Sequence, residues 1–181
     1  ILNFNTDLTL AKNSHLIFEA IVEVEKIKIK TYKFLKKLVS KDTFFLTNTS
    51  SISIGYLEEK SGLDGRLIGY HFYNPPVVQK LVEVICSKQT KSELKDIANE
   101  LGKRLGKILF TANDVPGFIG NGHWIRDGLY VIDKLVELKK QYKYPEAVYI
   151  LNRVTQDFLL RPMGMFQLID YVGVDIFQAI A

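Results

Sequence analysis

The chain has 181 residues, 47% hydrophobic and 24% charged, which is an ordinary composition for one or two globular domains. The net charge is +4, and the basic residues are spread along the chain apart from a lysine-rich stretch at 26–37. A typical nucleic-acid-binding surface needs a higher local density of positive charge, with aromatic residues interleaved. Cys86 is the single cysteine, so an internal disulfide is excluded and a reducing, cytoplasmic location is expected. No apolar run of about 18 residues predicts a membrane span. The lysine-rich stretch fits a phosphate-bearing small molecule, or a plain solvated helix face.

Short apolar runs alternate with longer polar segments over the first two thirds of the chain. The runs predict buried strands at His15–Ile21, Thr43–Thr47, Leu67–Phe72, Leu81–Ile85 and Ile108–Thr111. Helices are predicted at Val24–Val39, where a local Lys-Ile alternation would also fit a strand, and at Lys91–Leu105. Thr90 and Glu93 predict a capping box for the second helix, and Gly106 predicts its end. This alternation indicates βαβ units in a parallel sheet with helices on both faces.

The pattern changes after Pro116-Gly117, and nothing beyond Ile119 predicts a strand. Helices are expected at about Gly122–Gln141, Pro145–Leu160 and Phe166–Val172, with Pro145 in a first turn. We therefore expect an α/β domain over residues 1–115 and an all-α domain over residues 116–181.

His71 and Glu83 carry the strongest functional signal. They stand twelve residues apart, on either side of an Asn-Pro-Pro break, so two neighbouring strands can bring their side chains face to face. A histidine can exchange a proton near neutral pH, and a carboxylate on its second nitrogen fixes the tautomer and stabilises the charged form. Glu83 inside an apolar strand is costly to bury unless it is paired. The alternative is that His71 is only a hydrogen-bonded core histidine.

Polar residues at the ends of other predicted elements are candidate ligand contacts. Residues 48–51 follow a strand, where ligands of open α/β sheets bind, although they could simply cap the next segment. Glu23 and Lys28 could meet a ribose hydroxyl and a phosphate, or form an ordinary surface pair. Asn121 stands near the start of a long helix, where a cap is the alternative. Neither a metal-ligand spacing nor a Gly-x-Gly-x-x-Gly loop is present.

Taken in order, four motifs resemble the 3-hydroxyacyl-CoA dehydrogenases, NAD-dependent enzymes of fatty-acid β-oxidation and related pathways. The motifs are Asn48-Thr49-Ser50-Ser51, His71-Phe72-Tyr73-Asn74-Pro75, Lys80-Leu81-Val82-Glu83-Val84-Ile85 and Pro116-Gly117-Phe118-Ile119 with Asn121. The similarity runs from Ile1 to about Val174. It implies a Rossmann-like nucleotide-binding domain followed by an all-α C-terminal domain, with a homodimer formed through the helices.

The resemblance implies a reaction and a role for each matching residue. The reaction is reversible oxidation of a (3S)-3-hydroxyacyl-CoA to the 3-ketoacyl-CoA, with hydride passing from C3 to NAD⁺. The implied roles are general base and orienting carboxylate for His71 and Glu83, substrate contact for Ser50 and Asn121, and cofactor contact for Glu23, Lys28 and Asn48. Acyl-chain length and the choice between NAD and NADP stay open.

The sequence departs from the family pattern in three places. The family's first βαβ unit, which bears the glycine-rich pyrophosphate loop, is missing and is expected upstream of Ile1. Asn121-Gly122-His123 stands where the family commonly has Asn-Arg, and Arg161-Pro162-Met163-Gly164-Met165 stands where Gly-Pro is usual after the Met. The alternatives are a non-catalytic relative on the same scaffold and a basic module for nucleic acid, which no motif supports.

Overall fold

The computed structural model describes residues 3–181 and divides into two compact units, Ile1–Ile119 and Gly120–Ala181. Each unit is described by itself. In chain order the first contains the short 3-10 helix η1 (Leu8–Asn13), β1 (Leu16–Glu19), α1 (Glu25–Leu38), β2 (Phe44–Thr47), α2 (Ile54–Ser61), β3 (Leu67–Phe72), β4 (Leu81–Ile85), α3 (Ser92–Arg104) and β5 (Ile108–Ala112).

Within residues 3–181, five strands form one sheet in the order β1-β2-β3-β4-β5. β1, β2 and β3 are parallel, β4 is antiparallel to β3, and β5 is parallel to β4. The α/β class is therefore confirmed, whereas the expectation of an all-parallel sheet is wrong for the last two strands. The segment between β3 and β4 is residues 73–80 and contains no helix. A parallel return needs a longer crossover, so this short segment reverses the chain.

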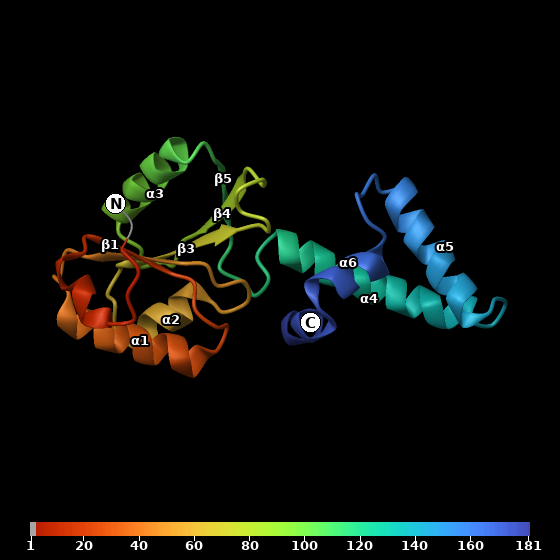
Figure 1. The fold of residues 1–181 in the computed structure, drawn as a ribbon, viewed down its shortest axis with the longest axis horizontal. Coiled ribbons are helices and arrows are strands. Elements are labelled where there is room, and N and C mark those ends of the chain that lie inside the picture. The colour runs from red at the N-terminus through yellow and green to blue at the C-terminus, as the bar shows by residue number, and fades with distance from the viewer. Residues whose placement is uncertain (1–2) are drawn as a thin grey trace. The chain divides into compact units, whose positions relative to one another are not determined.

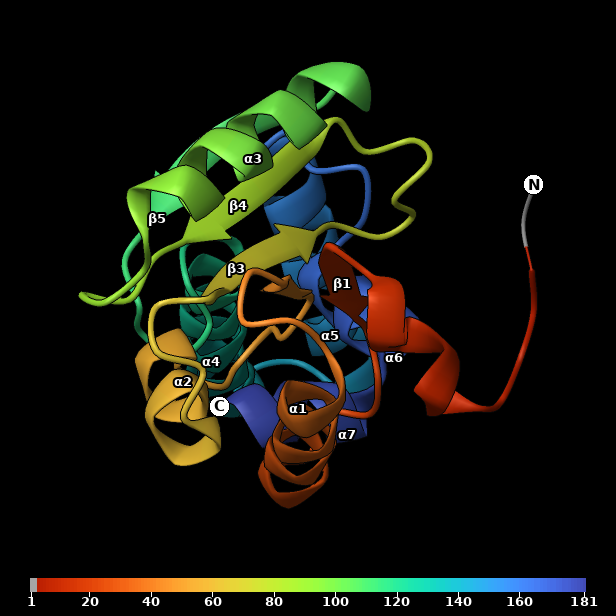
Figure 2. The ribbon, with the colours of Figure 1, turned by 90° about the vertical axis from the view of Figure 1, so that its left-hand side faces the viewer.

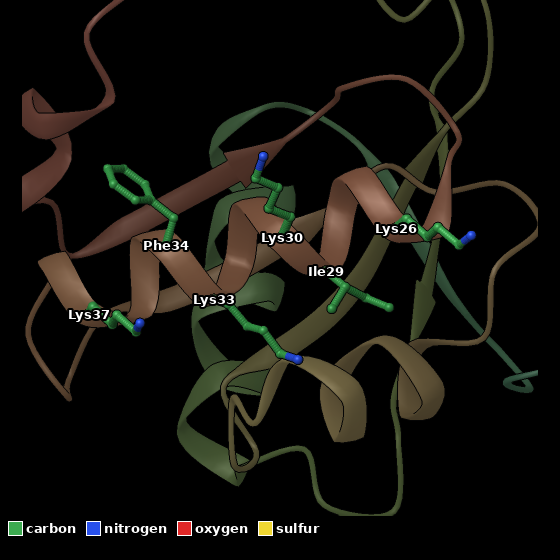
Figure 3. Close-up of a pocket in the computed structure, with 6 residues that line it drawn as sticks. All are labelled: Lys26, Ile29, Lys30, Lys33, Phe34 and Lys37. Carbon is green, nitrogen blue, oxygen red and sulfur yellow. The ribbon is translucent and has the colours of Figure 1, made fainter.

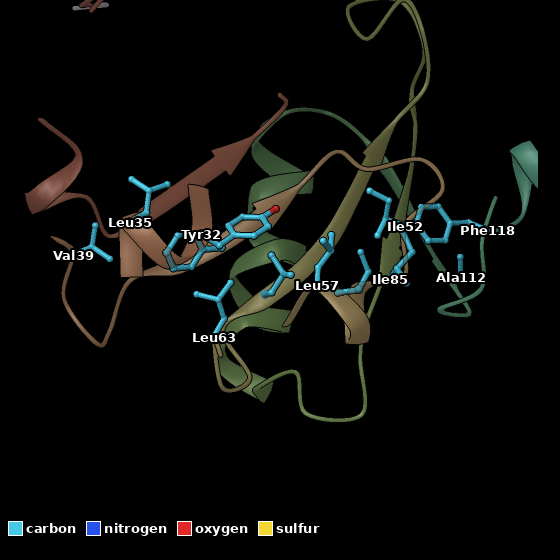
Figure 4. Close-up of a cluster of buried hydrophobic side chains, with 12 residues drawn as sticks. Tyr32, Leu35, Val39, Ile52, Leu57, Leu63, Ile85, Ala112 and Phe118 are labelled. Carbon is cyan, nitrogen blue, oxygen red and sulfur yellow. The ribbon is translucent and has the colours of Figure 1, made fainter. Parts of the chain in front are cut away.

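Helices cover both faces of the sheet, as predicted. α3 lies on one face and α1 and α2 lie on the other, as Figures 1 and 2 both show. Figure 4 shows the apolar cluster beneath α1 and α2, which contains Tyr32, Leu35, Leu57, Leu63 and Ile85. The α3 side holds a second cluster with Phe44, Leu46, Ile68, Tyr70, Val82, Leu94 and Ala98. Successive strand residues point to opposite faces, so a sheet covered on both faces needs the nearly continuous apolar runs seen in the sequence.

Two local predictions are wrong. β1 is a strand at the edge of this sheet, and its Leu16 and Phe18 remain 36% and 43% exposed rather than buried. The capping box of α3 does not form, because Lys91 is the N-cap residue. The hydroxyl of Thr90 instead donates to the carbonyl of Leu67 at 3.2 Å.

Other helix predictions are confirmed. Gly106, with φ 63°, follows the end of α3 as expected. The segment with Lys-Ile alternation is helical, and its buried residues Lys28, Tyr32 and Leu35 recur at the spacing of one helix face.

The second unit is helical, as predicted, with α4 (Gly120–Leu138), α5 (Tyr144–Asp157), α6 (Met165–Val172) and α7 (Val174–Ile180). Pro145 stands in the first turn of α5. The core of the unit consists of Trp124, Ile125, Val131, Leu135, Ala147, Leu151, Met165, Ile169 and Phe177. Gly128 allows a close approach here, since a Cβ on it would lie 2.5 Å from a ring carbon of Phe177. Among the described helices, none has the length and apolar character needed to cross a membrane.

Candidate active site

The antiparallel pair β3–β4 brings His71 and Glu83 face to face. The two residues are direct register partners, and Nδ1 of His71 lies 2.6 Å from Oε2 of Glu83. Side chains opposite each other on one face of an antiparallel pair are close enough to interact. The prediction that neighbouring strands join these two side chains is confirmed, while their catalytic roles stay predictions.

Glu83 is fully buried, and both of its carboxylate oxygens accept hydrogen bonds. Oε2 faces His71, and Oε1 accepts the backbone N–H of Ile119 at 2.9 Å. A buried carboxylate without such partners would be strongly destabilising. The two contacts fix the orientation of the carboxylate, which in turn fixes the plane of the imidazole.

Two aromatic rings flank the imidazole of His71, which is 5% exposed. The ring centroids of Tyr73 and Phe118 lie 5.3 Å and 5.7 Å from that of His71. Phe118 has φ 46°, a left-handed conformation that is strained for a large side chain, and Gly117 before it has φ 79°. These consecutive positive φ angles turn the chain so that Phe118 packs on His71 and the N–H of Ile119 reaches Glu83.

The arrangement defines which nitrogen of His71 can act on a substrate. When Oε2 of Glu83 accepts a hydrogen bond from Nδ1–H, the neutral ring carries its proton on Nδ1. Nε2 is then the acceptor nitrogen. The dyad can therefore take a proton at Nε2 and stabilise the resulting imidazolium through Glu83.

Glu23 accepts hydrogen bonds from the loop that follows β2 and holds it in place. Its Oε1 accepts the backbone N–H groups of Ser50 at 2.8 Å and Ser51 at 3.0 Å, and the hydroxyl of Thr49 at 2.5 Å. Burial opposes ionisation, but these hydrogen bonds and the charge of Lys28 hold the pKa of Glu23 below its usual range. The loop is thus organised around an ionised carboxylate.

Lys28 is buried, at 1% exposed, so the alternative of an ordinary surface pair with Glu23 is wrong. Its Nζ lies 2.8 Å from Oε1 of Glu19 and 3.2 Å from Oε2 of Glu23. Sequence reasoning missed Glu19, which is also buried, at the end of β1. The signal was available, because Glu19 interrupts an apolar run just as Glu83 does.

Asn48 ties the same loop to β3 beside His71. Its Oδ1 accepts the backbone N–H of Phe72 at 2.9 Å. The N-cap of α2 is Ser53, whose hydroxyl oxygen accepts the N–H of Tyr56, whereas Thr49 caps the turn before it by accepting the N–H of Ile52 at 3.2 Å. Asn48 therefore links the polar loop after β2 to the strand that carries the histidine.

The two predicted substrate contacts lie in different units. Ser50 is half-buried in the loop after β2, and Asn121 is the second residue of α4. Asn121 is thus inside the helix rather than at the residue that precedes it, where a cap would stand. Within residues 3–181, no group of three or more His, Cys, Asp or Glu could hold a metal ion.

The lysine-rich stretch forms an outer face of α1. A hollow of about 470 Å³ lies there, and the residues that line it are Lys26, Ile29, Lys30, Lys33, Phe34 and Lys37 (Figure 3). In this view Lys26 and Lys37 stand at opposite ends of the helix, so the ammonium groups do not converge. This arrangement favours the solvated helix face over a dedicated phosphate site.

The parallel strands β1–β3, with polar loops after their carboxyl ends, define an α/β domain of the nucleotide-binding class. Residues 1–115 match the family described as "3-hydroxyacyl-CoA dehydrogenase, NAD binding domain". The chain belongs to the 3-hydroxyacyl-CoA dehydrogenase family. NAD is the cofactor of this domain family.

Individual relatives agree with this assignment. The chain is 34% identical over 180 residues to the probable 3-hydroxybutyryl-CoA dehydrogenase of Deinococcus radiodurans, covering 99% of this chain and 62% of that protein. It is 33% identical over 172 residues to the mitochondrial hydroxyacyl-coenzyme A dehydrogenase of Homo sapiens, covering 92% of this chain and 51% of that protein. The chain thus spans between about half and three fifths of the length of these relatives.

Solved structures agree as well. FadB2 of M. tuberculosis matches with a TM-score of 0.88 and 30% identity, covering 98% of this chain and 61% of that one. The (S)-3-hydroxybutyryl-CoA dehydrogenase PaaH1 from Ralstonia eutropha matches with a TM-score of 0.86 and 27% identity, covering 97% of this chain and 60% of that one.

Proposed function

We propose that this chain takes part in the reversible NAD-dependent oxidation of (3S)-3-hydroxyacyl-CoA to 3-ketoacyl-CoA, in fatty-acid β-oxidation or a related pathway. The observation that carries the proposal is the buried contact of 2.6 Å between His71 Nδ1 and Glu83 Oε2. The names of the relatives, which include 3-hydroxybutyryl-CoA dehydrogenases, support the substrate class.

His71 is the proton-transfer group in this proposal. Nε2 takes the proton of the substrate hydroxyl while the C3–H bond breaks and the hydride leaves with its electron pair. NAD⁺, when bound, would be held by Glu23 and Asn48 and would supply the hydride acceptor for this step. Glu83 accepts the Nδ1–H throughout and so stabilises the imidazolium. In the reverse direction the imidazolium returns its proton to the ketone oxygen, and such proton transfer contributes about 10²–10⁴-fold to the rate.

The residues after β1 and β2 are chemically suited to the cofactor. We infer that Glu23 and Asn48 contact it directly, because both lie at the carboxyl ends of parallel strands. The ammonium of Lys28 already faces Glu19, Glu23 and the carbonyl of Ile21. Lys28 therefore acts on the cofactor through Glu23, by holding that carboxylate in place.

The remaining parts of the proposal concern substrate and assembly. Ser50 carries a hydroxyl and Asn121 an amide, and each group is of a kind that can hydrogen-bond a substrate oxygen. We propose residues 1–115 as the nucleotide-binding domain and residues 116–181 as a helical domain that forms a homodimer. Exposed apolar side chains on α4, among them Leu129, Tyr130 and Val136, support an interface there. A cytoplasmic location is proposed from the free thiol of Cys86.

Acetoacetyl-CoA-dependent oxidation of NADH, followed by absorbance, tests the proposed function. The protein should turn over this substrate, and His71→Ala should lower kcat by about 10²–10⁴-fold. His15→Ala is a matched control, because His15 is exposed on the same unit, and it should keep full activity. Absence of turnover with every 3-ketoacyl-CoA tried would contradict the proposal and favour a non-catalytic relative.

A further inference from the structure

A second buried polar cluster lies at the carboxyl ends of β1 and β2, separate from the His71–Glu83 pair. It contains Glu19, Lys28, Tyr32 and Thr47, and each is less than 5% exposed. Glu19 and Thr47 are register partners on neighbouring strands, and Tyr32 reaches them from α1. Figure 4 shows the Tyr32 side chain extending into the interior beneath the sheet.

Glu19 is the centre of this cluster. Its Oε1 accepts the ammonium of Lys28 at 2.8 Å and the backbone N–H of Ile21 at 2.7 Å. Its Oε2 accepts the hydroxyls of Tyr32 and Thr47, both at 2.6 Å. These four donors, all in the described part of the chain, match the acceptor capacity of a carboxylate. Burial opposes ionisation, but the donors, led by Lys28, hold the pKa of Glu19 below its usual range.

Two routes connect Glu19 to the loop at residues 48–51. In the first, Lys28 bridges from Glu19 to Glu23 Oε2 at 3.2 Å, and Glu23 Oε1 accepts the N–H of Ser50 at 2.8 Å. In the second, the hydroxyl of Thr47 donates to Glu19 and its oxygen accepts the N–H of Thr49 at 3.2 Å. Each route ends on the backbone of the loop.

We propose that Glu19 is a positioning residue of the active site, holding Lys28 and Thr47 so that Glu23 and the loop at residues 48–51 keep one conformation. This inference rests on the proposed function, because the loop carries Asn48 and Ser50. Well-packed apolar side chains can stabilise an interior at least as well as buried ion pairs. Removing one partner of such a pair is costly, but the intact network is distinguished from an apolar interior by the geometry that it imposes on the loop.

Amide hydrogen exchange of Ser50 and Ser51, measured by NMR on the full chain, tests the positioning without any activity. Glu19→Gln keeps the size of the side chain but removes its charge, so both amides should exchange about tenfold faster, the effect of losing about one hydrogen bond. Glu58→Gln is the matched control. Glu58 is 1% exposed and accepts the N–H of Leu67 and the hydroxyl of Ser87, away from this loop, so its variant should leave both amides unchanged.

Unchanged exchange in Glu19→Gln would overturn the inference, and so would equal acceleration in Glu58→Gln. If Glu19→Gln does not fold, Thr47→Val tests the second route alone, and the exchange of Thr49 should accelerate about threefold. In the enzyme assay, Glu19→Gln should raise KM for NADH about tenfold while kcat changes by less than about threefold. A wild-type protein without turnover would refute the proposed function and leave the exchange test intact.

Discussion

Replacing Glu83 with Gln exchanges one carboxylate oxygen for an amide nitrogen without changing the size of the side chain. Glu83 uses both oxygens as acceptors, for His71 Nδ1 at 2.6 Å and for the N–H of Ile119 at 2.9 Å. Glutamine keeps a single acceptor oxygen, so one of these two donors would face an NH₂ group. If that donor is His71, the ring relieves the clash by carrying its proton on Nε2. This is the nitrogen that must accept the substrate proton.

The structure predicts a larger effect on activity than on stability. Losing one hydrogen bond to a charged group at this fully buried site costs about 1.5–3 kcal/mol, and the change of tautomer recovers part of it. Loss of the acceptor nitrogen removes general-base catalysis, which corresponds to about 10²–10⁴-fold in kcat. The variant should therefore fold but turn over substrate slowly.

The assay combines kcat for NADH-dependent reduction of acetoacetyl-CoA with the free energy of unfolding from urea titration. Glu58→Gln is again the control, because it neutralises another buried carboxylate on the same unit. A kcat for Glu83→Gln within about threefold of wild type would refute the orienting role. An equal fall of kcat in Glu58→Gln would show that the loss of any buried carboxylate on this unit lowers activity.

Two further predictions concern stability. The pKa values of Glu19 and Glu23 are lowered in the fold, so the stability they add is present above the unfolded pKa of about 4.3 and is lost as the pH falls through their folded values. Glu19→Gln should therefore lower the free energy of unfolding, measured by urea titration at neutral pH, by about 3 kcal/mol. The difference between wild type and variant should be smaller near pH 3, and a difference that does not change with pH would contradict this. Gly102→Ala in α3 should lower Tm, because the added Cβ would lie 2.6 Å from Leu109 Cγ. The cost of this overpacking, about 1–3 kcal/mol, exceeds the gain of about 1 kcal/mol from the higher helix propensity of alanine, and a rise in Tm would contradict this.

The strands and longer helices could be predicted because their patterns are local. A strand such as β2, with Phe44, Phe45 and Leu46 all buried, needs apolar residues on both faces and is visible in the sequence. α2 was not predicted, since Ile54–Ser61 is short and its buried face combines the apolar Ile54 and Leu57 with the polar Glu58 and Ser61. The direction of β4 was also missed, because apolar composition does not encode whether a strand runs parallel or antiparallel.

The site was predictable to the extent that a single residue demanded a partner. Glu83 in an apolar strand required a donor, and His71 was at a suitable spacing. Glu19 made the same demand, but its partners Lys28 and Thr47 come from a helix and a different strand, so only the fold brings them together. The capping box of α3 failed for the same reason, because a distant strand carbonyl takes the hydroxyl of Thr90.

The tautomer of His71 tests the central claim most directly. Long-range ¹H–¹⁵N NMR on the full chain, at a pH where the ring is neutral, assigns the proton to Nδ1 or Nε2. The contact of 2.6 Å between Nδ1 and Glu83 predicts a protonated Nδ1 and an acceptor Nε2 in the wild type. Glu83→Gln should shift the proton toward Nε2. A wild-type ring protonated on Nε2 would contradict the assignment of His71 as a base oriented by Glu83.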